Sequence, residues 1–254
     1  MKIRVLGCSG GIGGLAATTS FLVDSDILID AGTGVGSLSL DELAQIDHVF
    51  LTHSHLDHIN SLPLMADSVG MVRHQPVNVY GRAETIDTLQ QHILNGKVWP
   101  DFTVIPSVDT PFLKLHRLEP GSKTTIGNRH LVSVPVNHAV PAVGYVLGNH
   151  NGWLAFTGDT TETDEFWRVI NGMDNLRYLF IETTFTNEHI ELARIAKHLC
   201  PSMLASELQK LTQHPEVHLT HLMPGAEKTI LAEIAELIPD GTPKPLTRDQ
   251  LFEL

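Results

Sequence analysis

Four side chains that can bind metal ions lie within six residues of one another. The segment 53–58 reads His-Ser-His-Leu-Asp-His and follows the apolar run 49–51. Neutral imidazole nitrogens and carboxylate oxygens are good ligands for Zn²⁺. Because one loop presents all four groups, it can serve two neighbouring ions without a long loop closure. We expect His53 and His55 on one ion, and Asp57 and His58 on the other.

Four ligands on one loop cannot complete two coordination shells, so partners must come from elsewhere in the chain. Three candidates each follow a run of β-type residues: His138 in Pro-Val-Asn-His, Asp159 in Thr-Gly-Asp-Thr and His221 in Leu-Thr-His. The chain has 15 histidines, and any single one is more simply explained as a solvated or hydrogen-bonded residue. The whole set in this order is hard to explain structurally, so the sequence predicts a two-ion centre.

The elements that would position these residues alternate between strand-like and helix-like patterns. Short β-type runs cover 3–6, 20–23, 27–30, 48–52, 112–118, 130–136, 142–147 and 152–157. Helical patterns cover 81–99, ended by Pro100 and Asp101, then 188–199 and 226–237, with Pro201 in the first turn of a further helix. Since no linker or repeat divides the chain, we expect a single α/β domain over 1–254.

Composition predicts a globular and acidic protein. Of the 254 residues, 42% are hydrophobic, and the formal net charge is -12. This charge disfavours nucleic acid as a partner. A small anionic substrate still fits, because two divalent ions would make the site locally positive. We expect no membrane span, since there is no run of about 18 apolar residues, and the two distant cysteines, Cys8 and Cys200, fit a reducing cytoplasm.

The seven candidate ligands resemble, in type and order, those of the metallo-β-lactamase superfamily, and the resemblance spans almost the whole chain. It implies an αββα sandwich, in which two mixed sheets are flanked by helices and the metals lie at the sheet edge. Carried over residue by residue, it implies one metal on His53, His55 and His138, a second on Asp57, His58 and His221, and Asp159 bridging both. Zn²⁺ is the expected ion, with Mn²⁺ or Fe²⁺ as alternatives.

Further segments resemble the class II cyclic-nucleotide phosphodiesterases. They are Leu56 inside the metal motif, 6–11 (Leu-Gly-Cys-Ser-Gly-Gly), 30–33 (Asp-Ala-Gly-Thr), 95–102 (Asn-Gly-Lys-Val-Trp-Pro-Asp-Phe) and 197–201 (Lys-His-Leu-Cys-Pro). Pro63 and Ala66 depart from the family's usual run of aliphatics and serine. The resemblance implies hydrolysis of 3′,5′-cyclic AMP or GMP to 5′-monophosphates. Two ions about 3.5–4 Å apart can hold a bridging hydroxide for in-line attack on such a diester.

Three residues are candidates for catalysis. Asp57 belongs to the ligand set, whereas His198 matches a family histidine near the scissile phosphate. Glu182, in Phe-Ile-Glu-Thr-Thr, could orient His198, because carboxylates commonly align imidazoles. The structural alternatives are a histidine stabilised at a helix C-terminus and a surface acid at a strand end. The general acid for the leaving group stays unassigned.

Two other segments have both a functional and a structural explanation. Asn95, Trp99 and Phe102 could line a nucleotide pocket, but large aromatics at a helix end usually pack in a core, which we predict for Trp99 and Phe102. The segment 11–16 fits a loose dinucleotide fingerprint, yet a β-type run at 18–23 stands where that motif requires a helix. We expect a tight turn beside the metal site instead.

Three functions stay open. The first is a cyclic-nucleotide phosphodiesterase. The second is a hydrolase with the same metal site but another substrate: a tRNA 3′ end, a 2′,3′-cyclic phosphate, a sulfate ester, a thioester or a lactone. Acidic charge counts against tRNA. The third is a non-catalytic ligand carrier, although such relatives typically lose ligands that are all present here. Whether the chain forms a homodimer is also open.

Overall fold

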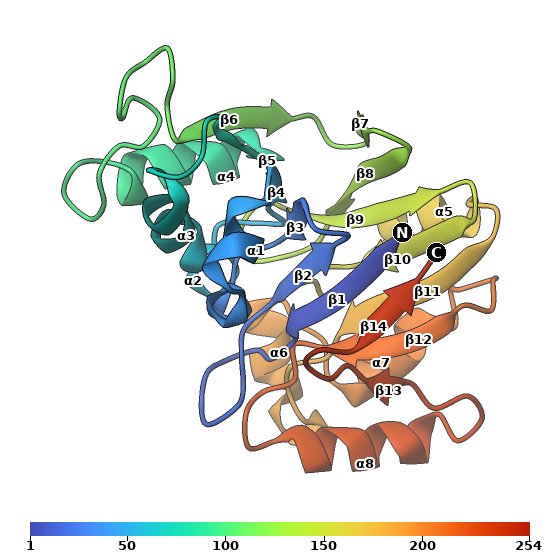
Figure 1. The fold of residues 1–254 in the computed structure, drawn as a ribbon. Helices are drawn as coiled ribbons and strands as arrows, with labels where there is room; N and C mark the ends of the chain where they lie inside the picture. Colours follow the sequence, from blue (N-terminus) through green and yellow to red (C-terminus); the bar gives the residue numbers. More distant parts are fainter.

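Two seven-stranded β-sheets pack face to face and carry helices on their outer surfaces (Figure 1). The computed structural model describes residues 1–254. The first sheet contains, in spatial order, β14 (Leu251–Glu253), β1 (Lys2–Gly7), β2 (Ser20–Val23), β3 (Ile27–Ile29), β4 (His48–Phe50), β5 (Val77–Arg82) and β6 (Leu113–Leu118). The second contains β13 (Lys244–Pro245), β12 (Glu216–Thr220), β11 (Leu176–Glu182), β10 (Gly152–Phe156), β9 (Ala142–Asn149), β8 (Arg129–Val136) and β7 (Lys123–Ile126).

Each sheet has an antiparallel part and a parallel part. In the first sheet β14, β1, β2 and β3 pair antiparallel, whereas β3 to β6 pair parallel. In the second sheet β7 to β10 pair antiparallel, whereas β10 to β13 pair parallel. Both sheets are therefore mixed, which confirms the predicted αββα sandwich. Neighbouring parallel strands end at the same edge of a sheet, so the segments that leave β10 and β12 start on the same side.

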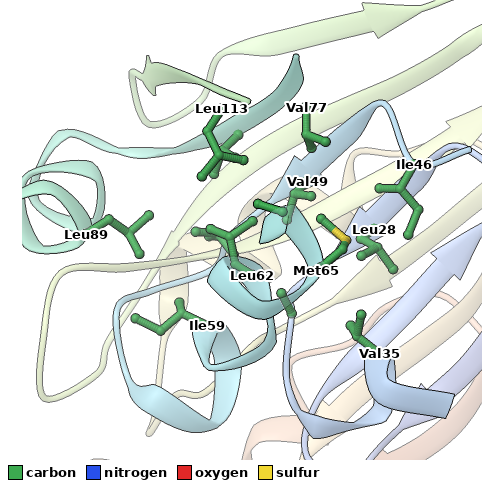
Figure 2. Close-up of a cluster of buried hydrophobic side chains, with 14 of the residues drawn as sticks. Leu28, Val35, Ile46, Val49, Ile59, Leu62, Met65, Val77, Leu89 and Leu113 are labelled. Atoms are coloured by element: carbon green, nitrogen blue, oxygen red, sulfur yellow. The ribbon is translucent and has the colours of Figure 1, made fainter. Parts of the chain in front are cut away.

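Helical segments cover both outer faces. Those of the first half are η1 (Thr33–Ser37), α1 (Leu40–Ala44), α2 (Leu56–Ile59), α3 (Ser61–Val69), α4 (Ala83–Thr88) and η2 (Leu89–Ile93). Those of the second half are α5 (Asp164–Asn171), η3 (Asn187–His189), α6 (Ile190–Ala196), α7 (Pro201–Leu208) and α8 (Glu227–Leu237). Figure 2 shows Leu62 and Met65 of α3 against Val49 of the first sheet. The longest helix has 11 residues, and none is long and apolar enough to cross a membrane.

The layer between the sheets is apolar and aromatic. Phe21 of β2 meets Phe156 of β10 edge-on with ring centroids 4.9 Å apart, and Phe50 of β4 meets Tyr145 of β9 at 5.7 Å. All four side chains are at most 2% exposed. Burying a side chain of this size contributes about 2–3 kcal/mol. These contacts hold the two sheets against each other and thereby fix the relative positions of the strand ends.

Each predicted strand segment overlaps a strand of the structure, but two predicted helices have wrong bounds. The segment 81–99 begins as the last part of β5, and its helical part ends at Ile93. It ends there because the side-chain oxygen of Asn95 accepts hydrogen bonds from the backbone amides of Lys97 and Val98, both at 2.9 Å. The predicted helix 188–199 ends at Ala196, because Lys197 adopts a left-handed φ of 57°. Pro201 begins α7 as predicted.

Candidate metal centre

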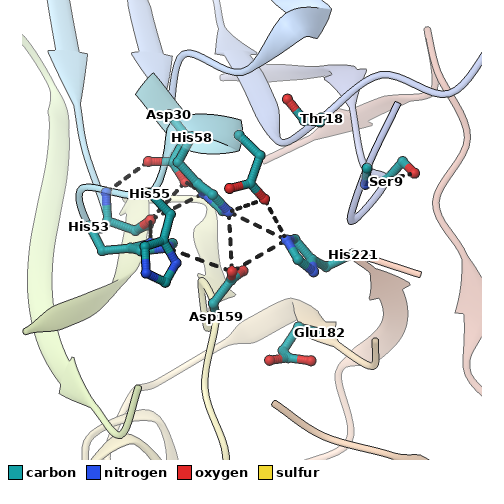
Figure 3. Close-up of polar contacts among 12 residues, drawn as sticks. Ser9, Thr18, Asp30, His53, His55, His58, Asp159, Glu182 and His221 are labelled. Atoms are coloured by element: carbon teal, nitrogen blue, oxygen red, sulfur yellow. Dashed lines mark hydrogen bonds and ion pairs between the residues drawn. The ribbon is translucent and has the colours of Figure 1, made fainter. Parts of the chain in front are cut away.

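The seven predicted ligand residues come together where loops from both sheets meet (Figure 3). One group consists of His53, His55, His138 and Asp159, and the other of Asp57, His58, Asp159 and His221. Within each group, the nitrogen and oxygen atoms that could bind an ion all lie within 4.8 Å of one another. Asp159 belongs to both groups, which is the arrangement that a bridging ligand requires.

The turn between β4 and α2 presents four of these residues. The chain is still extended at His55, which immediately precedes the first turn of α2, whereas Asp57 and His58 lie within that turn. The change from extended to helical backbone directs the two pairs of side chains differently. For this reason His53 and His55 join one group while Asp57 and His58 join the other.

The remaining three residues follow strands β8, β10 and β12. Gly158, which precedes Asp159, has a φ of 61° and leaves room for little besides hydrogen, since a Cβ there would lie 3.1 Å from the carbonyl oxygen of Val143. His221 itself adopts a left-handed φ of 60°, which costs on the order of 1 kcal/mol or more for a residue other than glycine. Its backbone amide donates to the carbonyl of Cys8 at 2.7 Å, which holds this conformation.

Four of the five imidazole rings are oriented through their Nδ1 atoms. The partners are the Thr52 hydroxyl for His53 (2.9 Å), the Asp30 carboxylate for His58 (2.7 Å), the Lys197 carbonyl for His138 (3.0 Å) and the Thr184 hydroxyl for His221 (3.0 Å). An imidazole whose Nδ1 donates a hydrogen bond keeps the lone pair of Nε2 free. The four rings are thus held in the orientation that a metal ligand needs, with Nδ1 engaged and Nε2 as the atom available to an ion.

Asp30 is a buried residue of the centre that the sequence analysis did not assign to it. Its carboxylate accepts hydrogen bonds from the Thr52 amide and the Thr52 hydroxyl, both at 2.8 Å, and from Nδ1 of His58. Asp30 follows β3 directly, just as Asp159 follows β10, so the same strand-end signal could have identified it. Thr184, which bonds to His221, was missed because a threonine after a strand is not distinctive.

Two buried polar atoms of the centre have no hydrogen-bond partner. They are Nε2 of His53 and Oδ1 of Asp159. An unsatisfied buried polar atom costs about 1–3 kcal/mol. In addition, Nε2 of His58 and Nε2 of His221 face each other at 3.4 Å. Imidazole nitrogens and carboxylate oxygens that converge in this way are the donors that divalent metal ions take, so the residues present fit a divalent metal site.

Burial and the carboxylates act in opposite directions on positive charge at the histidines of the centre. Burial, together with the neighbouring His58, lowers the pKa of His53 well below its ordinary value. Burial also acts to lower the pKa of His58, but the carboxylates of Asp159 and Asp30 outweigh it and raise that pKa well above the ordinary value. The carboxylates therefore draw a proton onto His58, and they would attract a divalent cation for the same reason.

His198 and Glu182 form a hydrogen-bonded pair beside the ligand groups. Nδ1 of His198 lies 2.7 Å from Oε1 of Glu182, and the His198 ring stacks on that of His221 with centroids 5.3 Å apart. Glu182 is fully buried, so the alternative of a surface acid is wrong. Burial opposes a charge on His198, but the charge and hydrogen bond of Glu182 prevail and raise the pKa of His198 to about 9.

The segment with Asn95, Trp99 and Phe102 makes its contacts within the first half of the fold. The side chain of Asn95 bonds to backbone groups of Gln91, Lys97 and Val98. Phe102 is 3% exposed within the core cluster beneath α3, and Trp99 packs against the same cluster. The prediction of core packing for the two aromatics is confirmed. The predicted tight turn in 11–16 is confirmed as well, since the Ala16 amide donates to the Gly13 carbonyl at 2.9 Å and β2 follows.

Comparison with known proteins places the chain in a family. A family model described as "Beta-lactamase superfamily domain" matches residues 25–231. A probable 3′,5′-cyclic-nucleotide phosphodiesterase of Yersinia pestis is 26% identical over 223 residues, which are 75% of this chain and 63% of that protein. Ribonuclease Z of Methanococcus maripaludis is 34% identical over 107 residues, which are 41% of this chain and 32% of that protein.

The fold agrees with this assignment. The crystal structure of unliganded yeast PDE1 matches with a TM-score of 0.81 at 20% identity, covering 100% of this chain and 99% of that one. The chain spans less than two thirds of the length of the Yersinia pestis and Methanococcus maripaludis proteins. The family match, the two mixed sheets and the paired ligand groups lead to one conclusion: the chain belongs to the metallo-β-lactamase superfamily.

Proposed function

We propose that this protein is a two-metal phosphodiesterase that hydrolyses 3′,5′-cyclic nucleotides to 5′-monophosphates. The observation that carries the proposal is the pair of ligand groups that share Asp159, with the Glu182–His198 pair directly beside them. The similarity to the probable cyclic-nucleotide phosphodiesterase of Yersinia pestis supports the choice of substrate. Two adjacent cations suit a phosphodiester because its anionic oxygens can contact both.

The residue roles follow from the two groups. His53, His55 and His138 would hold one ion, Asp57, His58 and His221 the other, and Asp159 would bridge them. A bound pair of divalent ions supplies Lewis acidity to the phosphoryl oxygens and lowers the pKa of water. Zn²⁺ fits the nitrogen-rich donor set best, with Mn²⁺ or Fe²⁺ as alternatives.

Asp57 is suited to act on the attacking water. Its side chain is 31% exposed, whereas that of Asp159 is 2% exposed. Burial acts to raise the pKa of Asp57, but its hydrogen bond with His221 and the charge of His58 outweigh burial and lower it, so the carboxylate is ionised. An ionised carboxylate that reaches the open side of the centre would accept a hydrogen bond from the attacking water and orient it.

His198 is suited to contact the phosphate of the substrate. With Nδ1 held by Glu182, its Nε2 is free to donate a hydrogen bond to a phosphoryl oxygen. Glu182 is itself fixed by the amides of Thr160 (3.0 Å) and Leu199 (3.2 Å), so the pair is rigid. His198 is therefore assigned to substrate binding and Glu182 to positioning it.

A second candidate is cleavage of another phosphodiester, which the similarity to ribonuclease Z favours. A net charge of -12 opposes a polyanionic substrate such as tRNA. A small diester thus remains the preferred substrate class. We also propose a cytoplasmic location, which the two free cysteines support.

Substrate profiling of zinc-loaded protein tests the proposal. Cyclic AMP, cyclic GMP, an aryl phosphodiester, a precursor tRNA, a thioester and a lactone are offered to protein whose metal content is known. We expect turnover of the cyclic nucleotides that disappears in Asp159→Ala. Activity confined to the thioester or lactone would overturn the proposal, and tRNA cleavage without cyclic-nucleotide turnover would favour the second candidate. Zinc-loaded protein that hydrolyses none of them would indicate a ligand carrier.

A further inference from the structure

Lys197 has a backbone conformation that lysine rarely adopts. Its φ is 57° and its ψ is 52°, in the left-handed region. Six residues other than glycine have a positive φ, and four of them are aspartate or asparagine, whose short polar side chains tolerate it. The other two are Lys197 and His221, which is a predicted metal ligand. Because residues held in this region cluster at functional sites, Lys197 is a candidate for a functional role.

The left-handed residue ends α6 and turns the chain toward the end of β11. The His198 amide donates to the carbonyl of Ala193, five residues earlier, at 2.9 Å. This bond is typical of a helix that is closed by a left-handed residue, a position that glycine usually occupies. After the turn, Leu199 is fully buried, and its carbonyl accepts a hydrogen bond from the Thr184 amide at 3.0 Å. The turn is therefore fixed on the side that faces the metal centre.

Three consecutive residues of this turn bond to residues of the centre. The Lys197 carbonyl accepts a hydrogen bond from Nδ1 of His138 at 3.0 Å. Nδ1 of His198 lies 2.7 Å from the carboxylate of Glu182, and the Leu199 amide donates to the same carboxylate at 3.2 Å. A rotation of the backbone at Lys197 would therefore move the acceptor of His138 and the ring of His198 together.

The His198 ring lies between imidazoles of the two ligand groups. Its centroid is 4.9 Å from that of His138, in one group, and 5.3 Å from that of His221, in the other. Figure 3 shows Glu182, the partner of His198, beside Asp159 and His221. A displaced turn would thus disturb a predicted ligand and the proposed substrate-binding histidine at the same time.

The backbone of Lys197 makes these contacts, not its ammonium group. All hydrogen bonds of Lys197 involve backbone atoms: its amide donates to the carbonyl of Arg194 at 3.3 Å, and its carbonyl accepts from His138. A residue at this position must therefore allow the left-handed conformation, whatever its side chain. Glycine allows it without strain, whereas a β-branched residue strongly disfavours it.

We infer that Lys197 is a positioning residue, whose left-handed backbone orients His138 in one ligand group and His198 at the substrate. The part of this inference that concerns His138 rests on the metal centre alone. The part that concerns His198 rests on the proposed phosphodiesterase function. Together they connect the binding of one ion with contact to the substrate through a single turn of the chain.

Substitutions that change the backbone preference at position 197 test the inference. In Lys197→Val we expect the affinity for one of the two zinc ions to fall roughly tenfold, because the outer hydrogen bond to His138 is weakened. In the zinc-saturated variant, kcat for cyclic AMP should also fall roughly tenfold, because His198 is displaced. Lys197→Ala and Lys197→Gly should bind zinc and turn over cyclic AMP as the wild type does. Lys197→Thr repeats the test if Lys197→Val does not fold.

The matched control is Asn175→Val. Asn175 also has a left-handed φ, of 56°, but it precedes β11, at the end of the strand opposite Glu182. This control should lower the free energy of unfolding in urea and leave zinc affinity unchanged. It separates a general loss of stability from a loss of orientation at the centre.

Unchanged zinc affinity in Lys197→Val would overturn the inference, and so would an equal loss in Lys197→Ala, in Lys197→Gly or in Asn175→Val. Weaker zinc binding with an unchanged kcat would overturn the part that concerns His198. Wild-type protein that binds zinc but does not hydrolyse cyclic nucleotides would overturn the proposed function. The zinc affinities of the variants would still decide the part that concerns His138.

Discussion

Replacing Asp30 by asparagine is expected to weaken metal binding while preserving the fold. Asparagine has nearly the same size and tolerates the left-handed φ of 57° at this position. Aspartate accepts from the Thr52 amide with one oxygen (2.8 Å) and from Nδ1 of His58 with the other (2.7 Å). Asparagine has a single acceptor oxygen, so when that oxygen serves the Thr52 amide, its NH2 group faces Nδ1 of His58 and cannot accept a hydrogen bond from it. His58 would then place its proton on Nε2, the atom that points into the centre between Asp159 and His221.

The expected magnitude follows from the contacts that change. Loss of an outer hydrogen bond to a ligating histidine typically costs roughly 10–100-fold in metal affinity, or about 1.4–2.7 kcal/mol. Asp30→Ala should be worse, because it leaves the amide and hydroxyl of Thr52 and Nδ1 of His58 without a buried acceptor. At about 1–3 kcal/mol each, these losses would also destabilise the fold by several kcal/mol.

Zinc competition against a chromophoric chelator measures the affinity, and urea unfolding of the metal-free protein measures the stability. Asp26→Asn is the matched control, because Asp26 also lies next to β3 but bonds to Arg129 at 2.7 Å, away from the ligand groups. It should leave zinc affinity unchanged. If Asp30→Asn bound zinc as tightly as the wild type, the account of how His58 is oriented would be refuted.

Three further predictions concern His198, Gly10 and the pH dependence of stability. His198→Ala should retain zinc but lower turnover of a cyclic nucleotide roughly 100-fold, and unchanged turnover would remove His198 from the site. Gly10→Ala should weaken zinc binding, because its Cβ would lie 2.7 Å from the carbonyl oxygen of His221; an unaltered zinc isotherm would contradict this. The hydrogen bond from Arg129 lowers the pKa of Asp26, so its stabilising effect is present above the ordinary aspartate pKa of about 3.9 and is lost as pH falls below it. The free energies of unfolding of the wild type and of Asp26→Asn, measured in urea, should therefore converge as the pH falls towards 3. A difference that does not change with pH would contradict this prediction.

The ligand positions were predictable because their signal is local. Each of them follows an apolar strand, and the residue type at a strand end can be read directly from the sequence. The order of four segments then defines the centre without any knowledge of distances. The structure brings together all of these residues, although their binding of metal stays a prediction.

The partners that orient the ligands were less predictable, because they depend on contacts between distant segments. Asp30 meets His58 where β3 pairs in parallel with β4. Glu182 is buried where β11 pairs with β12 and where His198 and Leu199, between α6 and α7, bond to its carboxylate. A strand-end carboxylate looks the same in sequence whether it is exposed or buried. Whether such a carboxylate is exposed or buried depends on the topology of the sheet.

The misplaced helix at 81–99 has a similar cause. The apolar spacing of Ile86, Leu89 and Ile93 does occur in helical backbone, but Val77 to Arg82 precede it as a strand paired with β4 and β6. That pairing is non-local and outweighs local propensity. The end of the helix was also predicted wrongly, at 99 instead of Ile93, although Asn95 and Gly96 form a turn signal that could have located it.

Zinc stoichiometry tests the central claim most directly. Metal-free protein is dialysed to equilibrium against buffered zinc, and the ions bound per chain are counted by mass spectrometry of the metal. Two ligand groups that share Asp159 predict two ions per wild-type chain and fewer in Asp159→Ala. A wild-type chain that saturates with a single ion, or an Asp159→Ala variant that still binds two with unchanged affinity, would contradict the two-ion centre.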